Sequence, residues 1–263
     1  MGRKILRRIR KDLTSKIRQY KKTSFFLDYD GTLTPIKEKP QQAKIDKEAK
    51  ALLKEISKKD WTEVFILSGR GLQDVKRQLG IKTITYIGNH GMEAEGPGFK
   101  FIHKPALRSR PAIQRCYRLL KKNLRFKGTA LENKKYTLSF HYRGADNAKK
   151  PLIKRLFWNT ISKVIRTGGD IVITTGKEVL EVRPNINWNK GSIVKWLLAK
   201  KHLKGSLPIC IGDDKTDEDA FKALGKKGIS ILVCPRKRKT HAKYRLDSPD
   251  EVIELLDYIC KNR

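Results

Sequence analysis

Five short apolar runs recur along the chain, and segments with helical periodicity separate them. The runs are FFLDY at 25–29, VFILSG at 64–69, TITYIG at 83–88, PICIGD at 208–213 and ISILVC at 229–234. Runs with so few polar interruptions predict strands that are buried on both faces. Strands that alternate with helices predict an α/β fold, in which a parallel sheet carries helices on both faces.

The residues between the third and fourth runs follow a different pattern. Two stretches, 111–126 and 146–166, have helical periodicity, and residues 129–143 alternate like one half-buried antiparallel strand. The segment IVITTGKEVLEVRP predicts a hairpin that turns at Thr175-Gly176-Lys177. Two helices over a small antiparallel sheet make a compact insert. We interpret this insert as a cap domain that covers the catalytic site predicted below.

These patterns divide the chain into three parts. We expect a core domain of residues 23–103 and 184–263, an inserted cap domain of residues 104–183 and a basic amphipathic helix at residues 1–22. In the N-terminal helix, apolar side chains recur at helical spacing at Ile5, Ile9, Leu13, Ile17 and Tyr20. We favour a stripe that docks on the core with its arginines solvated, and the alternative is a helix that lies on an anionic surface.

Polar side chains follow four of the predicted strands, at the point where each strand ends. They are Asp28 and Asp30 after the first strand, Ser68, Gly69 and Arg70 after the second, Gly88, Asn89 and His90 after the third, and Asp213 and Asp214 after the fourth. In parallel α/β sheets, ligands bind outside the carboxyl ends of the strands. The four groups therefore predict a catalytic site at one edge of the sheet.

The acids at these strand ends predict a metal site. Asp213, Asp214 and Asp217 lie in the run GDDKTDEDAF, opposite the strand end that carries Asp28 and Asp30. Acids at the end of a buried strand destabilise the fold unless a cation or hydrogen bonds compensate them. Oxygen ligands completed by water suit Mg²⁺, although they do not distinguish it from Mn²⁺ or Co²⁺.

Three further features lie close to these strand ends. Thr216 and Asp219 have the spacing of a helix-capping box, which explains the later acids of the run but not the first two. Lys190 is the first residue of a predicted helix, where a positive charge is unfavourable because it opposes the helix dipole. A bound phosphate would explain why a lysine occupies this position. The turn from Ser68 to Gly71 offers a hydroxyl and backbone N–H groups to an anion.

Together these groups describe phosphoryl transfer through an aspartyl-phosphate. Asp28 would attack phosphorus, and Asp30 would protonate the leaving alkoxide and then take a proton from water. A metal and Lys190 would neutralise charge on the transferring group. Asp30 must then arrive protonated while Asp28 is ionised, so we expect different environments for the two carboxyl groups.

The motifs that carry these residues resemble a known family. DxDGT at 28–32, Ser68, Lys190 and GDDxxD at 212–217 are similar to the four motifs of the haloacid dehalogenase superfamily of phosphatases. DYDGTLTPI, LSGR, GNHGME, the ENK and HYR pair, EVRP followed by KG, and GDDKTDEDAF resemble the trehalose-6-phosphate phosphatase family. The resemblance covers about residues 24–260. It implies a Rossmann-like core with an inserted α/β cap.

The resemblance also implies roles for individual residues. Asp28, Asp30, Ser68 and Lys190 would be catalytic, and Ser68 and Lys190 would hold the phosphate. The Asp28 side chain, the Asp30 carbonyl and Asp213 would hold Mg²⁺, with Asp214 and Asp217 in support. The sugar contacts would be Gly69, Arg70, Asn89 and His90 in the core, and Glu132, Lys134, Arg143, Lys177 and Glu181 in the cap. Trp188, just before Lys190, departs from the family pattern.

Composition sets the cellular context and leaves one question open. No run approaches about 18 apolar residues, and the N-terminus lacks the apolar stretch of a secretory signal. The four cysteines form no zinc motif, and Cys210 and Cys234 lie in strand-like runs, so we expect buried free thiols in a reducing cytoplasm. The net charge of +33 would suit a phosphorylated substrate, nucleic acid or an acidic membrane, but we favour a proteome that is rich in Lys and Arg as its cause. The basic cluster at 235–245 could dock on an anionic partner, and we favour a solvated loop and helix face.

Three functions stay open at this point. The first is Mg²⁺-dependent hydrolysis of trehalose 6-phosphate in trehalose biosynthesis, and contact with a trehalose-6-phosphate synthase is also left open. The second is a sibling activity on sucrose phosphate or a glycosyl phosphoglycerate, which only the cap residues would distinguish. The third is nucleic-acid binding on a phosphatase-like scaffold, which the sparse aromatic residues among the basic runs disfavour.

Overall fold

The computed structural model describes residues 2–37, 42–176 and 178–263, without side-chain placement for residues 2–5 and 8. Its contacts divide the chain into two compact units. Unit 1 consists of Met1–Phe101 and Trp188–Arg263, and unit 2 is the continuous segment Ile102–Asn187. Among the described residues, no helix is both long and apolar enough to cross a membrane.

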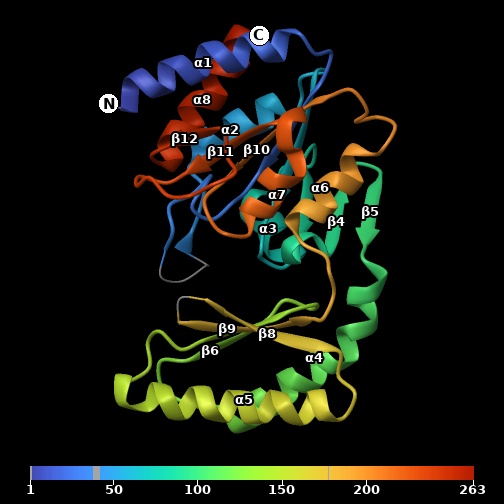
Figure 1. Ribbon diagram of the computed structural model, residues 1–263, viewed down its shortest axis with the longest axis vertical. Coiled ribbons are helices and arrows are strands. Elements are labelled where there is room, and N and C mark those ends of the chain that lie inside the picture. The colour runs from blue at the N-terminus through green and yellow to red at the C-terminus, as the bar shows by residue number, and fades with distance from the viewer. Residues whose placement is uncertain (1, 38–41, 177) are drawn as a thin grey trace. The chain divides into compact units, whose positions relative to one another are not determined.

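An eight-stranded sheet with the order β12-β11-β10-β1-β2-β3-β4-β5 forms the centre of unit 1 (Figure 1). Its strands are β1 (Thr23–Leu27), β2 (Thr62–Leu67), β3 (Thr85–Gly88), β4 (Glu93–Gly96), β5 (Phe99–Ile102), β10 (Leu207–Gly212), β11 (Ile229–Val233) and β12 (Tyr244–Leu246). The strands from β12 to β3 in this order are parallel to one another, and β4 runs antiparallel to β3. The sequence therefore predicted the α/β class and the parallel core correctly.

Helices cover both faces of this sheet, as expected for central strands that are buried at nearly every position. The helices are α1 (Gly2–Arg18), α2 (Lys47–Ile56), α3 (Leu72–Leu79), α6 (Lys190–Leu198), α7 (Asp217–Leu224) and α8 (Pro249–Asn262). Phe25 and Leu27 pack in one cluster with apolar residues of α1, α2, α3 and α8. Phe26 points to the other face and packs with residues of α6 and α7. The central strand β1 is therefore buried from both sides.

The N-terminal helix docks on this core. Its apolar side chains Leu6, Ile9, Leu13 and Ile17 are buried in the cluster that includes α8. Arg10 reaches from the polar side of α1 to Glu254 of α8, with 3.0 Å between the nitrogen and the carboxylate oxygen. The docking interpretation of the basic N-terminus is therefore confirmed for the described side chains.

Unit 2 is a four-stranded antiparallel sheet covered by two helices (Figure 1). Its strands pair in the order β6-β7-β9-β8, and its elements are α4 (Lys104–Asn123), β6 (Ala130–Asn133), β7 (Leu138–His141), α5 (Lys150–Arg166), β8 (Ile171–Gly176) and β9 (Val179–Pro184). Leu138, Phe140, Leu180 and Val182 point to the helices and share one core cluster with them. Alternate residues of β7 and β9 thus face away from the helices.

Three local predictions were wrong. The alternating stretch 129–143 is not one strand but the hairpin of β6 and β7, because Lys135 takes a left-handed backbone conformation with φ of 77° and reverses the chain. The first helix of the insert begins at Lys104 rather than at residue 111, and Pro111 lies inside it. Cys210 is buried as expected, but Cys234 is partly exposed.

Candidate active site

The site in unit 1 lies at the carboxyl ends of the parallel strands. Asp28 follows β1, Ser68 follows β2 and Asp213 follows β10, whose ends are adjacent in the sheet. Asp28 and Ser68 are buried, with exposed fractions of 5% and 1%. The parallel register aligns Leu27 with Ile66 and with Ile211, which brings these strand ends to the same edge. The convergence inferred from the sequence is therefore confirmed for these residues.

Lys190 connects two of the carboxylates. Its ammonium nitrogen lies 2.7 Å from Asp28 Oδ1 and 2.8 Å from Asp217 Oδ1, and its side chain is almost completely buried. Burial alone would lower the pKa of Lys190, but Asp217 and Asp28 outweigh it and raise the pKa well above the ordinary value. The lysine is therefore a fixed positive charge in the site.

A close helix contact puts Lys190 in this position. The next residue, Gly191, approaches α7 so tightly that a β-carbon there would lie 2.2 Å from the backbone oxygen of Asp219. Asn189 caps α6 by accepting a hydrogen bond from the Ser192 N–H at 2.9 Å. The first turn of α6 therefore lies directly against the first turn of α7, which carries Asp217.

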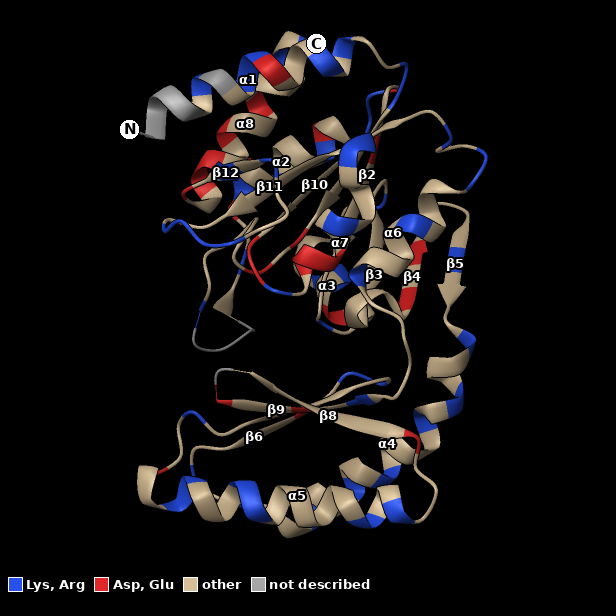
Figure 2. Ribbon diagram, in the orientation of Figure 1, with Lys and Arg blue, Asp and Glu red and all other residues tan. Residues whose placement is uncertain are grey.

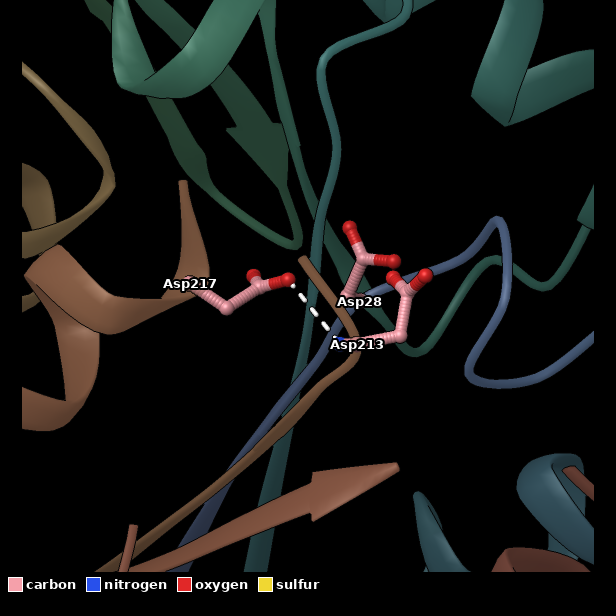
Figure 3. A group of neighbouring side chains, drawn as sticks. All are labelled: Asp28, Asp213 and Asp217. Atoms are coloured by element: carbon pink, nitrogen blue, oxygen red, sulfur yellow. Dashed lines mark hydrogen bonds between the residues drawn. The ribbon is translucent and has the colours of Figure 1, made fainter. Parts of the chain in front are cut away.

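Asp28, Asp213 and Asp217 form a group of three carboxylates (Figure 3). One oxygen atom from each lies within 4.8 Å of the others. Burial, followed by the charges of Asp217 and Asp214, raises the pKa of Asp213 to about 7. Burial also raises the pKa of Asp28 well above its ordinary value, against the effect of Lys190. The protein thus holds negative charge here at a free-energy cost that a bound cation would offset.

The donor atoms of this group fit a hard divalent cation. All three side chains of the group offer oxygen, and among the described residues no ion pair reaches the carboxylate of Asp213. Gly31 leaves room for that carboxylate, since a β-carbon at position 31 would lie 2.2 Å from Asp213 Oδ2. Oxygen ligands with space for water are the set that Mg²⁺ prefers. The residues present therefore fit the predicted ion.

Asp214 has a different position from the one expected of a metal residue. Its Oδ1 accepts hydrogen bonds from the backbone N–H and the hydroxyl of Thr216, both at 2.7 Å, and from the Asp217 N–H at 3.2 Å. Asp214, rather than the predicted box of Thr216 and Asp219, therefore caps α7, and Thr216 makes no side-chain cap bond. Burial would raise the pKa of Asp214, but Lys190 and these hydrogen bonds lower it to about 2.

Arg70 contacts Asp30 rather than an open surface. Its guanidinium donates to both carboxylate oxygens of Asp30 at 2.6 Å, and to Asp74 at 2.8 Å. The ring of Tyr29 lies 5.3 Å from the guanidinium carbon. Arg70 is only 5% exposed, so its polar atoms are largely engaged within unit 1. Asp30 is accordingly held in a bidentate ion pair with Arg70.

The turn after β3 contains a buried amide that the sequence placed at the sugar. Asn89 and His90 both have positive φ, 49° and 55°, and form the short 3-10 helix η2 (Asn89–Gly91). The Asn89 amide donates to Glu93 Oε1 at 2.7 Å, and the same oxygen accepts the Leu72 N–H at 3.1 Å. Asn89 is fully buried. Glu93, which sequence reasoning missed, therefore fixes this turn to the start of α3.

Neighbouring groups complete the turn. The His90 ring lies against Gly69, where a β-carbon would approach it to 2.6 Å, so a larger residue at position 69 would displace this ring. The Ser68 hydroxyl accepts a hydrogen bond from the Arg70 N–H at 3.1 Å. The indole of Trp188 donates to the carbonyl of Gly91 at 2.7 Å. The unusual tryptophan thus links the segment before Lys190 to the turn after β3.

In unit 2, three of the predicted sugar contacts gather on the sheet face that points away from the helices. The Lys134 ammonium lies 3.3 Å from Glu181 Oε1 and 4.0 Å from Glu132 Oε2. Ser139 donates to Glu181 at 3.1 Å, and the His141 ring lies 3.4 Å from Glu132. Sequence reasoning missed these two partners, although both stand on the polar side of the alternating pattern.

The two remaining predicted cap contacts are Arg143 and Lys177. Arg143 pairs with Glu178 at 3.7 Å, at the hairpin between β8 and β9. Lys177 lies outside the described residues. The group of Lys134, Glu132 and Glu181 is therefore the polar cluster that unit 2 presents.

Comparison with known proteins gives a consistent result. The model of the trehalose-phosphatase family matches residues 26–250. The chain is 36% identical to a probable trehalose-phosphate phosphatase 4 of Oryza sativa over an alignment of 249 residues, and the match covers 90% of this chain and 65% of that protein. It is 34% identical to trehalose-phosphate phosphatase B of Arabidopsis thaliana, with 90% and 66% covered. The chain thus spans slightly less than two thirds of the length of these plant relatives.

A solved structure of a related protein has the same fold over nearly the whole length of this chain. The C-terminal domain of the C. albicans trehalose-6-phosphate phosphatase superposes with a TM-score of 0.78 at 27% identity, and the match covers 95% of this chain and 96% of that one. The family match includes the strand end with Asp28, the helix start with Lys190 and the acidic run with Asp213. On this evidence the chain belongs to the trehalose-phosphatase family.

Proposed function

We propose that this protein is a phosphatase that hydrolyses trehalose 6-phosphate to trehalose and phosphate. The observation that carries the proposal is the buried contact of Lys190 with Asp28 and Asp217, beside Asp213 at the carboxyl edge of a parallel sheet. In this proposal Asp28 is the nucleophile, and it is supported by the adjacent ammonium of Lys190 and by the neighbouring carboxylates. The family of the chain supplies the substrate class.

In this mechanism Asp28 attacks phosphorus and forms an aspartyl-phosphate, and the bond from phosphorus to the sugar oxygen breaks. Asp28 must be ionised to attack, although its burial disfavours the charge. Lys190 favours the ionised form and neutralises charge on the phosphoryl group as it transfers. Ser68 offers its hydroxyl to the phosphate from the neighbouring strand end.

Asp30 acts as the acid and then the base. Once released from Arg70, it gives a proton to the sugar oxygen that leaves, and it later takes a proton from the water that attacks the aspartyl-phosphate. Asp28 and Asp213 would hold Mg²⁺ together with the Asp30 carbonyl, while Asp217 holds Lys190 and Asp214 caps α7. When bound, this ion would supply positive charge next to the phosphate.

The polar cluster of unit 2 is the part of the proposal that concerns the sugar. Glu132, Lys134 and Glu181 offer both acceptors and a donor, as recognition of sugar hydroxyls requires. Arg143 and Lys177 remain proposed sugar contacts of this unit on the strength of the family resemblance alone. Arg70 and Asn89, which are occupied by Asp30 and Glu93, would act by holding those partners rather than by contacting sugar.

A substrate panel tests the proposal. Phosphate release would be measured with trehalose 6-phosphate, sucrose 6-phosphate, glucose 6-phosphate and an aryl phosphate, each with Mg²⁺ and with EDTA, beside Asp28→Asn. We expect a strong preference for trehalose 6-phosphate that EDTA and the variant abolish. Metal-dependent activity without this preference would keep the chemistry and reject the substrate. Activity that persists in Asp28→Asn would reject the mechanism.

A matched pair of variants separates the sugar from the chemistry. Glu181→Gln should reduce turnover of trehalose 6-phosphate far more than that of the aryl phosphate, because the aryl group makes no sugar contacts. Asp170→Asn, at an exposed position just before β8 and outside the polar cluster, serves as the control. Equal losses on both substrates in Glu181→Gln would show that this residue does not recognise sugar.

A further inference from the structure

The helical face of unit 2 carries positive charge without any acid. Helix α4 contains seven Lys and Arg residues and helix α5 contains five, and neither contains Asp or Glu (Figure 2). Most of these basic side chains are exposed. Most other helices of the protein mix the two signs, as in α8, which includes Asp250, Glu251 and Glu254. The absence of acidic residues therefore distinguishes α4 and α5 from most other helices of the protein, and the surface that these two helices form is basic.

The same face carries most of the large apolar side chains that the protein exposes. Six such side chains are exposed among the described residues, and four of them lie on these two helices. They are Leu107 on α4, at 45% exposure, and Leu152, Trp158 and Ile165 on α5, at 38%, 43% and 41%. Helices α4 and α5 pack against each other, and exposed apolar side chains concentrated on one such pair of helices point to a binding surface.

The geometry of α5 puts two of these side chains on one stripe. Trp158 and Ile165 are seven residues apart, which is two helical turns, so they lie on the same side of the helix. The buried residues Phe157, Ile161 and Val164 occupy the side that packs on the sheet. Arg155, one turn before Trp158, and the other exposed basic residues of α5 flank the stripe.

We propose that this helical face binds the surface of an anionic lipid membrane. Lys and Arg attract anionic headgroups, while Trp, Leu and Ile enter the boundary between headgroups and acyl chains. The exposed aliphatic side chains favour lipid over nucleic acid, because phosphates and bases offer Ile165 and Leu152 little to contact. The proposal goes beyond hydrolysis of a phosphosugar and does not depend on it.

The arrangement of unit 2 is compatible with both activities. Glu132, Lys134 and Glu181 lie on the sheet face that points away from the helices, since Leu180 and Val182 on the same strand pack beneath α4 and α5. A membrane on the helical side would therefore leave the polar cluster free. The enzyme would be peripheral, held by two helices that remain folded on their own sheet.

Sedimentation with lipid vesicles tests this. The full chain would be mixed with phosphatidylcholine vesicles that contain about 30% phosphatidylserine, or with phosphatidylcholine alone, at low salt. We expect binding to the anionic vesicles only. The double variant Trp158→Ser with Ile165→Ser should lower the partition coefficient at least about tenfold. Ile36→Ser, which alters an exposed apolar residue of unit 1, should bind like the unaltered protein.

Further measurements distinguish a loss of membrane binding from a loss of folding. Unchanged phosphatase activity and thermal midpoint in the double variant would show that it is folded. Trp158→Phe should remove the blue shift of fluorescence on vesicle binding. No binding to anionic vesicles, or equal binding of the double variant, overturns the proposal. The proposal is also overturned if the protein binds an RNA oligonucleotide more tightly than it binds vesicles and the double variant loses affinity for both to the same extent. That result would assign the helical face to nucleic-acid binding.

Discussion

Replacing Asp217 with asparagine is expected to destabilise the protein far more than the same replacement at Asp28. The two carboxylates share Lys190, and both substitutions conserve shape. Their other partners differ. Asp217 Oδ2 also accepts the backbone N–H groups of Asp213 and Asp214, at 3.1 Å and 3.2 Å. Asp28 accepts one side-chain hydrogen bond, from Lys190, in the part of the chain that the structure describes.

The magnitude follows from what an amide can accept. In one orientation, the NH₂ group introduced by Asp217→Asn would face the ammonium of Lys190, and in the other it would face two backbone N–H groups. Either orientation leaves buried donors unsatisfied, at about 1–3 kcal/mol each, and weakens a buried ion pair, so we expect a loss of about 3–5 kcal/mol in all. At Asp28 the amide oxygen can face Lys190 while its NH₂ faces the Asp213 carboxylate (Figure 3).

Asp28→Asn should therefore change the free energy of unfolding by no more than about 1 kcal/mol, and it also removes a charge that burial disfavours. Both free energies would be measured by urea unfolding in EDTA at neutral pH, so that no divalent ion contributes. Both variants should be inactive. Equal destabilisation by the two variants, or a negligible effect of Asp217→Asn, would refute the reasoning from the backbone hydrogen bonds.

Three further predictions follow from the same region. Gly191→Ala should displace α6 from the Asp219 carbonyl and lower the thermal midpoint and kcat together, since a β-carbon would lie 2.2 Å from that oxygen. Because the pKa of Asp213 is raised to about 7, protons should compete with Mg²⁺ below that pH; calorimetric Mg²⁺ affinity should fall up to about tenfold per pH unit as pH decreases from 7. Arg70→Lys should lower kcat rather than raise KM, because lysine cannot hold both oxygens of Asp30.

Each of these has a control and a contrary result. Gly205→Ala places a β-carbon in open space at φ of 84°, so it should lose stability without losing kcat; if it matches Gly191→Ala, the helix contact is not the cause. Mg²⁺ affinity that is constant between pH 6 and 8 would exclude proton competition at Asp213. Arg77→Lys, at an exposed position, should be neutral, and a rise in KM alone for Arg70→Lys would restore Arg70 as a substrate contact.

The sequence was sufficient for features that depend on local pattern and on one topological rule. Apolar runs identified the parallel strands, and the rule for strand ends brought Asp28, Ser68 and Asp213 together. Lys190 could be recognised because a cation at a helix start is unfavourable by itself. Such inferences succeed because each needs only neighbouring residues and the common direction of the strands.

Features that depend on contacts between distant segments could not be predicted. The family resemblance assigned Asn89 and Arg70 to the sugar, and their contacts with Glu93 and Asp30 are visible only in three dimensions. The hairpin at Lys135 was missed because nothing but a lysine marks the left-handed residue where glycine or asparagine is more usual. Polar side chains have several partners of similar chemistry, and sequence spacing does not choose among them.

The position of β1 at the centre of its sheet has a consequence for synthesis on the ribosome. Thr23 pairs with Thr62 on one side and with Leu207 on the other, so the second pairing waits until most of the chain has emerged. Along the sequence, the residues of unit 2 lie wholly between Thr62 and Leu207, and this unit has its own apolar cluster. Its early folding would shorten the segment that separates β1 from β10 and so reduce the entropy lost when they meet. The inserted unit would thereby act as a fold-assisting spacer for the core that surrounds it in sequence.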